Sequence, residues 1–217
     1  MKNYREIFGK IDTSFYKKAA GRFLPKKIKS LFIFESPPFE PPILPITNKT
    51  NSDWSYFYRY ETDGSDNLRR IICSTLFDEK MTSAKSFLEK FCAQGYFLVD
   101  AVSYPIDDII SEHKYMVKLY KGKVHSDERE KIVFCESEEL VNTIKYWVEE
   151  SKSNLLNIKM IVIKAPVFRG LFTDDNKFKE KVEKGTFQVL NDYKIDYPLF
   201  DINTFKAEVR KLLKLSF

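Results

Sequence analysis

Glycine is scarce in this sequence, with 7 residues among 217, and no two glycines lie close together. Phosphate-binding loops of nucleotide-binding proteins need several glycines at short spacing, because the backbone must approach the phosphates closely. The sequence contains neither a G-x-G-x-x-G pattern nor a P-loop pattern. We therefore do not expect a nucleotide site of the Rossmann or Walker type.

Cysteine and histidine are also rare. The three cysteines, Cys73, Cys92 and Cys135, form no C-x-x-C pair, so zinc ribbons and four-cysteine iron–sulfur clusters are not supported. The two histidines, His113 and His125, have no second histidine or suitably spaced carboxylate nearby. This argues against a metal site and against Ser-His-Asp or Cys-His catalysis. We predict that the protein uses no metal and no cofactor.

Long apolar runs are missing as well. A membrane-spanning helix needs about 20 consecutive apolar residues, and the longest run here is a few residues long. The first residues contain no apolar signal-peptide core. We expect a protein without a membrane partner that works in a reducing, cytoplasmic location.

Aromatic and charged residues, in contrast, are abundant. Phe and Tyr number 19 and 12, and 43% of the residues are hydrophobic. Such a chain is too rich in aromatics to be disordered over most of its length. At 217 residues it is long enough to bury a sizeable core. With no clear linker in the sequence, we interpret residues 1–217 as a single domain.

Positive charge is concentrated in two segments. The net charge is +5, and residues 17–29 carry six Lys and Arg residues without an acid. A second group, Lys206, Arg210, Lys211 and Lys214, lies near the C-terminus. Both groups suit contact with the phosphates of DNA or RNA. The alternative is a solvated helix face in a lysine-rich protein.

The pattern of apolar residues predicts strands that alternate with helices. Buried strands are expected at 30–35, 96–102 and 158–164, because these are short, continuous apolar runs. Helices are expected at 12–24, 67–77, 82–93, 107–120, 138–152, directly after Pro166, and at 203–215. Residues 36–53 read as a long loop, since five of the nine prolines lie in 37–45. The predicted fold class is α/β, a three-layer sandwich with a mostly parallel central sheet.

Ligands of open parallel sheets bind beyond the carboxyl ends of the strands. Glu35 ends the first predicted strand, and Asp100 lies near the end of the second. A carboxylate that ends a strand of pure hydrophobics suits a general acid or base, or else binds the backbone amides of the following loop. We expect Asp100 either to orient a ligand or to hold the loop that follows its strand. Lys164 and Arg169 follow the third strand as candidate ligand-binding cations.

A dense group of aromatic residues follows the proline-rich loop. It comprises Trp54, Tyr56, Phe57, Tyr58 and Tyr60. Exposed rings of this kind stack on nucleic-acid bases, which contributes about 1–3 kcal/mol per base. The alternative is a half-buried strand in which the three tyrosines share one face.

The order of these features resembles the uracil-DNA glycosylase superfamily. The strand that runs into Glu-Ser-Pro-Pro at 35–38 and the aromatic triplet at 56–58 are similar to its first motif, a Gly-Glu-Ala-Pro-Gly-type loop followed by an aromatic that stacks on the flipped base. Residues 96–102 and 158–165 resemble its second and third strands. Residues 197–200, Tyr-Pro-Leu-Phe, lie where the family carries a His-Pro-Ser-type loop.

The sequence departs from the family at several positions. Phe34 and Pro38 replace the two glycines of the first motif, and Ser36 stands where some branches have a catalytic Asp. Tyr197 replaces the histidine of the last loop. The cysteines that hold a cluster in some branches are missing. The resemblance thus supports the fold more directly than the activity.

The resemblance implies a nucleic-acid base-processing enzyme that hydrolyses an N-glycosidic bond. Glu35 would position or activate water, and Tyr197 would hydrogen-bond to the departing base. The flipped base would be bound by the strand-end and loop residues Ser36, Pro37, Phe57, Tyr58 and Asp100, and its phosphates by Lys164, Arg169 and the basic segment 17–29.

Two other functions remain open. The missing histidine is compatible with a non-catalytic module that binds nucleic acid or protein on the same fold. A hydrolase of small molecules, with the 36–53 loop as a lid, is the third alternative.

Overall fold

The computed structural model describes residues 13–37, 56–60, 67–104, 106, 126–195 and 202–215. Most of the predicted 36–53 loop, the helix expected at 107–120, both histidines, and Tyr197 lie outside these ranges. No helix in the described ranges has the length and apolar character needed to cross a membrane.

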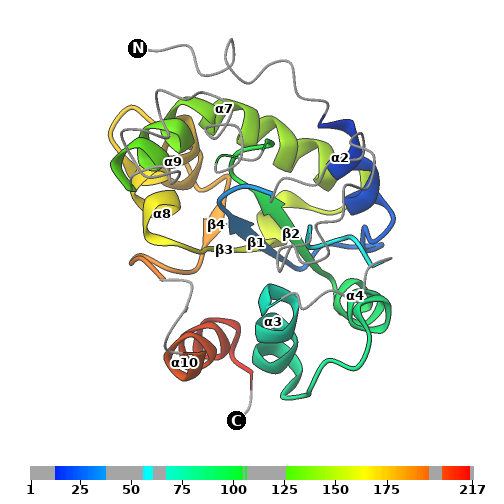
Figure 1. The fold of residues 1–217 in the computed structure, drawn as a ribbon. Coiled ribbons are helices and arrows are strands. Elements are labelled where there is room, and N and C mark those ends of the chain that lie inside the picture. The colour runs from blue at the N-terminus through cyan, green and yellow to red at the C-terminus, as the bar shows by residue number, and fades with distance from the viewer. Residues whose placement is uncertain are drawn as a thin grey trace, which may run out of the picture.

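A parallel four-stranded sheet forms the centre of the molecule (Figure 1). Its strands are β1 (Ser30–Phe34), β2 (Tyr96–Asp100), β3 (Lys159–Val162) and β4 (Gln188–Val189), in the order β2-β1-β3-β4. All three pairings are parallel. The predicted α/β class with a mostly parallel sheet is confirmed, and the three predicted strands lie where the apolar runs indicated.

Helices cover both faces of the sheet. The described helices are α2 (Ser14–Gly21), α3 (Asn67–Phe77), α4 (Ala84–Ala93), α7 (Ser126–Glu150), α8 (Ala165–Phe172), α9 (Lys177–Glu183) and α10 (Ile202–Leu213), with a 3-10 turn η1 at Leu155–Asn157. Figure 1 shows α2, α7, α8 and α9 on one side of the sheet and α3, α4 and α10 on the other. Every residue of β1 is buried, as expected for a central strand with helices on both faces.

The side chains of the strands pack against the helices on both faces of the sheet. The ring of Phe32 in β1 lies 6.0 Å from that of Phe91 in α4. The ring of Phe97 in β2 lies 5.3 Å from that of Trp147 in α7. Because side chains alternate along a strand, the same short apolar runs supply the core on both sides of the sheet.

The outer edge of β2 is closed by the hydroxyl of Tyr58. The backbone N–H of Leu98 donates to this oxygen at 2.6 Å, and the hydroxyl donates to the Leu98 carbonyl at 3.1 Å. Tyr58 is fully buried, and burial raises its pKa well above the usual value, so the hydroxyl keeps its proton. One side chain thereby satisfies two backbone groups that an edge strand leaves unpaired.

Replacing Tyr58 by Phe is expected to destabilise the fold by about 2–3 kcal/mol, because a buried N–H and a buried C=O both lose their partner. Urea denaturation would measure the loss. Tyr193→Phe is the matched control, since Tyr193 is 40% exposed, and it should change stability by less than about 0.5 kcal/mol. Equal stability of the two variants would show that the edge of β2 does not depend on this hydroxyl.

Helix α7 begins earlier than the sequence indicated. The prediction placed this helix at 138–152 and placed no helix in the charged stretch directly before it. The structure instead has one 25-residue helix from Ser126, and Ser137 is a buried residue inside it. The charged stretch contains enough inward-facing apolar residues to continue the helix, since Ile132 and Val133 are completely buried.

A close helix crossing holds the beginning of α7. A Cβ atom on Gly170 of α8 would come within 2.6 Å of the Glu130 carbonyl and 2.9 Å of the Val133 Cβ. Only glycine permits this approach. The crossing fixes the first turns of α7 above the carboxyl ends of the strands, and this placement matters for the site described next.

Candidate functional site

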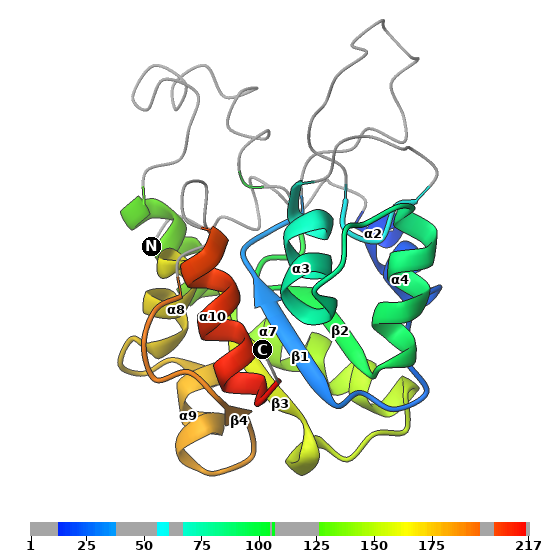
Figure 2. The same ribbon diagram turned by 90° about the horizontal axis from the view of Figure 1, so that it is seen from below.

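Three charged residues lie at or just after the carboxyl ends of three adjacent strands. Glu35 comes directly after β1, Asp100 is the last residue of β2, and Lys164 lies two residues after β3. The register pairs Phe34 with Asp100 and Ile33 with Val162, so the three strands end at the same level (Figure 2). The sequence placed these residues at one edge of the sheet, and the structure brings them there.

Glu35 is a buried carboxylate with two cationic partners. It is 3% exposed, and its Oε2 accepts hydrogen bonds from Arg129 Nη1 at 2.5 Å and from Lys164 Nζ at 2.9 Å. Its Oε1 is buried without a hydrogen-bond partner. The two ion pairs on Oε2 make Glu35 an anchor for Lys164 and Arg129.

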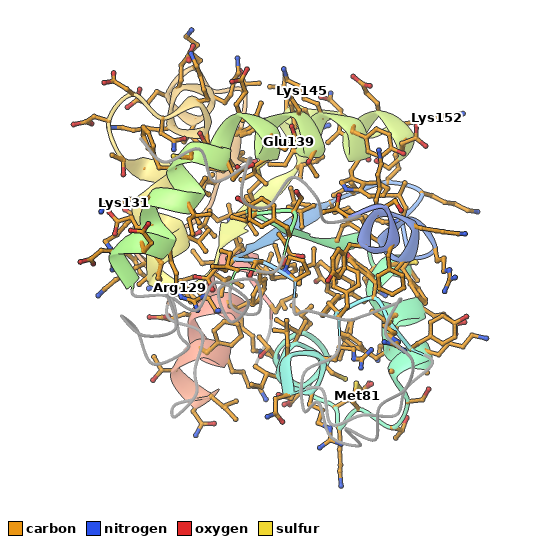
Figure 3. The ribbon with its side chains drawn as sticks, turned by 45° about the horizontal axis from the view of Figure 1, so that its top comes forward. Met81, Arg129, Lys131, Glu139, Lys145 and Lys152 are labelled. Carbon is orange, nitrogen blue, oxygen red and sulfur yellow. The ribbon has the colours of Figure 1, made fainter. Side chains whose placement is uncertain are left out.

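Arg129 is the residue of this site that the sequence analysis missed. It lies in the first turn of α7 (Figure 3), 94 residues from Glu35, and its side chain is 13% exposed. The sequence analysis predicted no helix at this position. Helical periodicity in the sequence could have identified it, because Arg129 shares the inward face of α7 with Ile132, Val133 and Glu136.

Lys164 has a strained backbone. Its φ is 78° and its ψ is 134°, a region that favours glycine and costs other residues about 1–3 kcal/mol. The Lys164 N–H donates to the Ile195 carbonyl at 2.7 Å, and α8 begins at the next residue, with Pro166 in its first turn as expected. The strained junction between β3 and α8 brings the Lys164 ammonium to Glu35.

Asp100 is the titrating group of the site. Its side chain is half-buried and makes no hydrogen bond within the described ranges. Its pKa is raised to about 7, chiefly by burial; the positive charge of Lys164 opposes this rise, and the negative charge of Glu35 adds a smaller contribution to it. A carboxyl group with a pKa near 7 exchanges its proton readily at neutral pH, which suits a general acid or base.

A buried phenol and carboxylate lie on the same side of the sheet as Arg129. The hydroxyl of Tyr104 donates to Glu136 Oε1 at 3.3 Å, and both residues are buried. Glu136 is two turns further along α7 than Arg129. The inner face of α7 therefore carries a second polar contact beyond the strand ends, which the sequence analysis did not identify.

Other predicted site residues have different surroundings. Ser36 is half-buried and Pro37 is buried, and both directly follow Glu35. Arg169 is not at the Glu35 cluster, because its Nε donates to Glu130 Oε2 at 2.6 Å across the α7–α8 crossing. This ion pair links the two helices.

The predicted stacking residues lie in the core. Phe57 is 3% exposed and its ring is 5.3 Å from that of Phe91, while Tyr58 closes the edge of β2. Residues 56–60 form a turn instead of the half-buried strand considered as an alternative. With neither ring exposed, the structure gives Phe57 and Tyr58 a packing role and presents neither to a ligand.

Two members of the C-terminal basic group, Lys206 and Arg210, are occupied by contacts within the fold. Lys206 pairs with Asp78. Arg210 is buried and its Nη1 donates to the Thr75 carbonyl at 3.3 Å. This guanidinium joins α10 to α3, so it does not lie on a surface that phosphates reach.

In the described ranges, no three His, Cys, Asp or Glu side chains are grouped so that they could hold a metal ion. Comparison of the chain with protein-family models, with curated proteins and with solved structures gave no match.

Proposed function

We propose that the chain is a hydrolase that releases a base from nucleic acid, with its active site at the carboxyl ends of β1, β2 and β3. The observation that carries this proposal is the meeting of Glu35, Asp100 and Lys164 at the ends of three adjacent strands. The order of strand, acid, second strand, third strand and short helix, which resembles that of uracil-DNA glycosylases, also supports the proposal.

Asp100 is the best candidate for the general base. Water attacks C1′ of the nucleotide and gives its proton to the Asp100 carboxylate. The C1′–N bond breaks, and its electron pair leaves with the base. A pKa of about 7 lets Asp100 take up this proton and release it again near neutral pH.

Lys164 and Glu35 have complementary roles in this scheme. The Lys164 side chain is 36% exposed, so its ammonium can face both solvent and Glu35, and it stabilises negative charge on the departing base. Glu35 is a positioning residue, because its Oε1 is buried and its Oε2 is occupied by Arg129 and Lys164. This differs from the initial expectation that Glu35 itself activates water.

The proposal predicts base release that depends on Asp100. Oligonucleotides with uracil or other altered bases, single- and double-stranded, would be incubated at low salt with the wild type, Asp100→Asn and Asp175→Asn. Asp100→Asn should slow release roughly 100-fold or more, the range typical for loss of a general base. Asp175 lies in an exposed turn between α8 and α9, so its variant should release bases at the wild-type rate.

The pH profile gives a second readout. Because a general base acts in its ionised form, release by the wild type should rise with pH and level off above about 7. Wild-type protein without release, or an Asp100→Asn variant as active as the wild type, would contradict the proposal.

A non-catalytic nucleic-acid-binding module is the second candidate. The double pairing of Glu35 and the burial of Phe57 and Tyr58 favour it, because these residues then serve the fold alone. It predicts binding without base release, and binding that is unaffected by Asp100→Asn.

A further inference from the structure

Lysines from three separate segments meet at the amino ends of the strands. Lys29 directly precedes β1, and Lys159 is the first residue of β3. The two are neighbours, because the Lys159 N–H donates to the Lys29 carbonyl at 3.0 Å. The sequence analysis recognised the segment 17–29 but not that Lys159, 130 positions further along the chain than Lys29, lies beside it.

The turn after α7 adds another lysine to this group. The Lys27 ammonium donates to the carbonyl of Lys152, and the Ile28 N–H donates to Ser153 Oγ at 2.7 Å. We call Lys26, Lys27, Lys29, Lys152 and Lys159 the lysine edge. All five residues are exposed, and none forms an ion pair with a carboxylate in the described part of the chain.

The lysine edge is built into the fold. A Cβ atom on Gly95, whose φ is 84°, would come within 2.8 Å of the Lys29 Cγ, so the stem of Lys29 lies tightly against this turn. The carbonyl of Gly95 also accepts hydrogen bonds from the N–H groups of Lys29 and Ser30, at 2.8 and 3.2 Å. The backbone of the edge is therefore fixed against the turn before β2.

Close placement of like charges opposes folding, and an anionic partner offsets this repulsion. Two acids, Glu149 and Glu150, precede the turn on α7, but neither pairs with a lysine of the edge in the described ranges. By contrast, Lys90 and Lys184 on other elements pair with Glu79 and Glu180.

We infer that the lysine edge binds the phosphate backbone of nucleic acid, away from the candidate active site. This inference rests on the proposed function for the nature of the partner. Figure 3 shows Arg129 and Lys152 at opposite ends of α7, a helix of 25 residues and about 37 Å. The lysine edge thus anchors nucleic acid while the strand ends carry out the chemistry, and binding is separable from turnover.

Additional cations continue the edge along one side of the molecule. Lys17 and Lys18 on α2 are exposed, and Lys17 Nζ lies 3.5 Å from the centre of the Tyr146 ring. In Figure 2 the segment after α2 runs down the β2 side of the sheet to the start of β1. An elongated basic surface fits a linear polyanion.

A membrane needs several apolar anchors, and Leu156, 62% exposed, is the one large apolar side chain exposed near the edge in the described ranges.

The test compares two triple variants of equal charge. Lys26→Gln/Lys29→Gln/Lys159→Gln alters the edge, and Lys177→Gln/Lys184→Gln/Lys211→Gln removes three exposed lysines elsewhere. Fluorescence anisotropy with a labelled single-stranded oligonucleotide of unmodified bases gives the Kd over a range of salt concentrations. Thermal unfolding of both variants confirms that they are folded.

We expect the edge variant to bind roughly tenfold more weakly or worse, and the slope of log Kd against log salt to fall by about 2, because each phosphate contact on a single strand contributes about 0.7. The control variant should bind nearly as the wild type does. If the wild type releases no base but binds the oligonucleotide through the lysine edge, the proposed activity is refuted and the lysine edge is supported.

Three results would overturn the inference. The first is a wild type that does not bind the oligonucleotide, and the second is an equal loss of affinity in both triple variants. The third is binding to vesicles of anionic phospholipid that depends on the lysine edge, together with no affinity for the oligonucleotide.

Discussion

Asp100→Asn is expected to make the folded protein more stable at pH 8, by about 4 kcal/mol, although it removes a residue of the candidate active site. In the wild type the folded state raises the pKa of Asp100 from 3.8 to about 7. At pH 8 the carboxylate is charged in both states, and burial penalises that charge only in the folded state. Asparagine has the same shape without the charge, so the penalty disappears.

The sign of the pH dependence follows from proton binding. Between pH 4 and pH 7 the folded state holds a proton on Asp100 that the unfolded state has released. Lowering the pH across this window therefore favours folding, and the contribution of Asp100 is least favourable above about pH 7. The difference in stability between Asp100→Asn and the wild type should shrink as the pH falls from 8 to 4.

Urea denaturation of both proteins at several pH values would measure this difference. Asp175→Asn is the control, because it makes the same chemical change in an exposed turn and should leave the pH dependence of the wild type intact. A difference between Asp100→Asn and the wild type that does not change with pH would show that Asp100 titrates normally, and it would remove the main support for its role as a base. A residue that lowers stability where it stands is typical of functional sites.

Glu35→Gln is expected to have the opposite effect and to destabilise the fold by about 2–4 kcal/mol. The amide cannot neutralise Arg129, whose side chain is 13% exposed and remains largely buried next to it. Lys164 contributes less to the loss, because its side chain is 36% exposed and can turn to water. The cost is mainly that of a buried cation without its counter-charge.

Two further variants separate this explanation from a general loss of packing. Adding Arg129→Met to Glu35→Gln removes the uncompensated charge and should recover more than half of the lost stability, as measured by urea denaturation. Glu130→Gln breaks the neighbouring pair with Arg169, which is more exposed, and should cost less than about 1 kcal/mol. No recovery in the double variant would mean that the Glu35 ion pairs are not what holds α7 to the sheet.

The amino-acid pattern alone was enough to predict the α/β class, the three main strands and most of the helices. These features depend on local patterns, such as the continuous apolar run of β1 and the first-turn Pro166 of α8. It also placed Glu35, Asp100 and Lys164 at one edge, because the carboxyl ends of parallel strands coincide. The predicted start of α7 was wrong, because the many charged residues of its first turns obscured the apolar pattern of the buried Ile132 and Val133.

The contacts of these residues could be found only from the packing of the whole fold. Arg129 reaches Glu35 across 94 residues, Tyr58 closes the edge of β2 across 40 residues, and Lys159 comes to lie beside Lys29. Burial of Asp100 and the consequent rise of its pKa depend on all the chain around it. Apolar periodicity records which face of an element is buried. It does not record which distant polar group lies opposite, because that is set by how the layers pack.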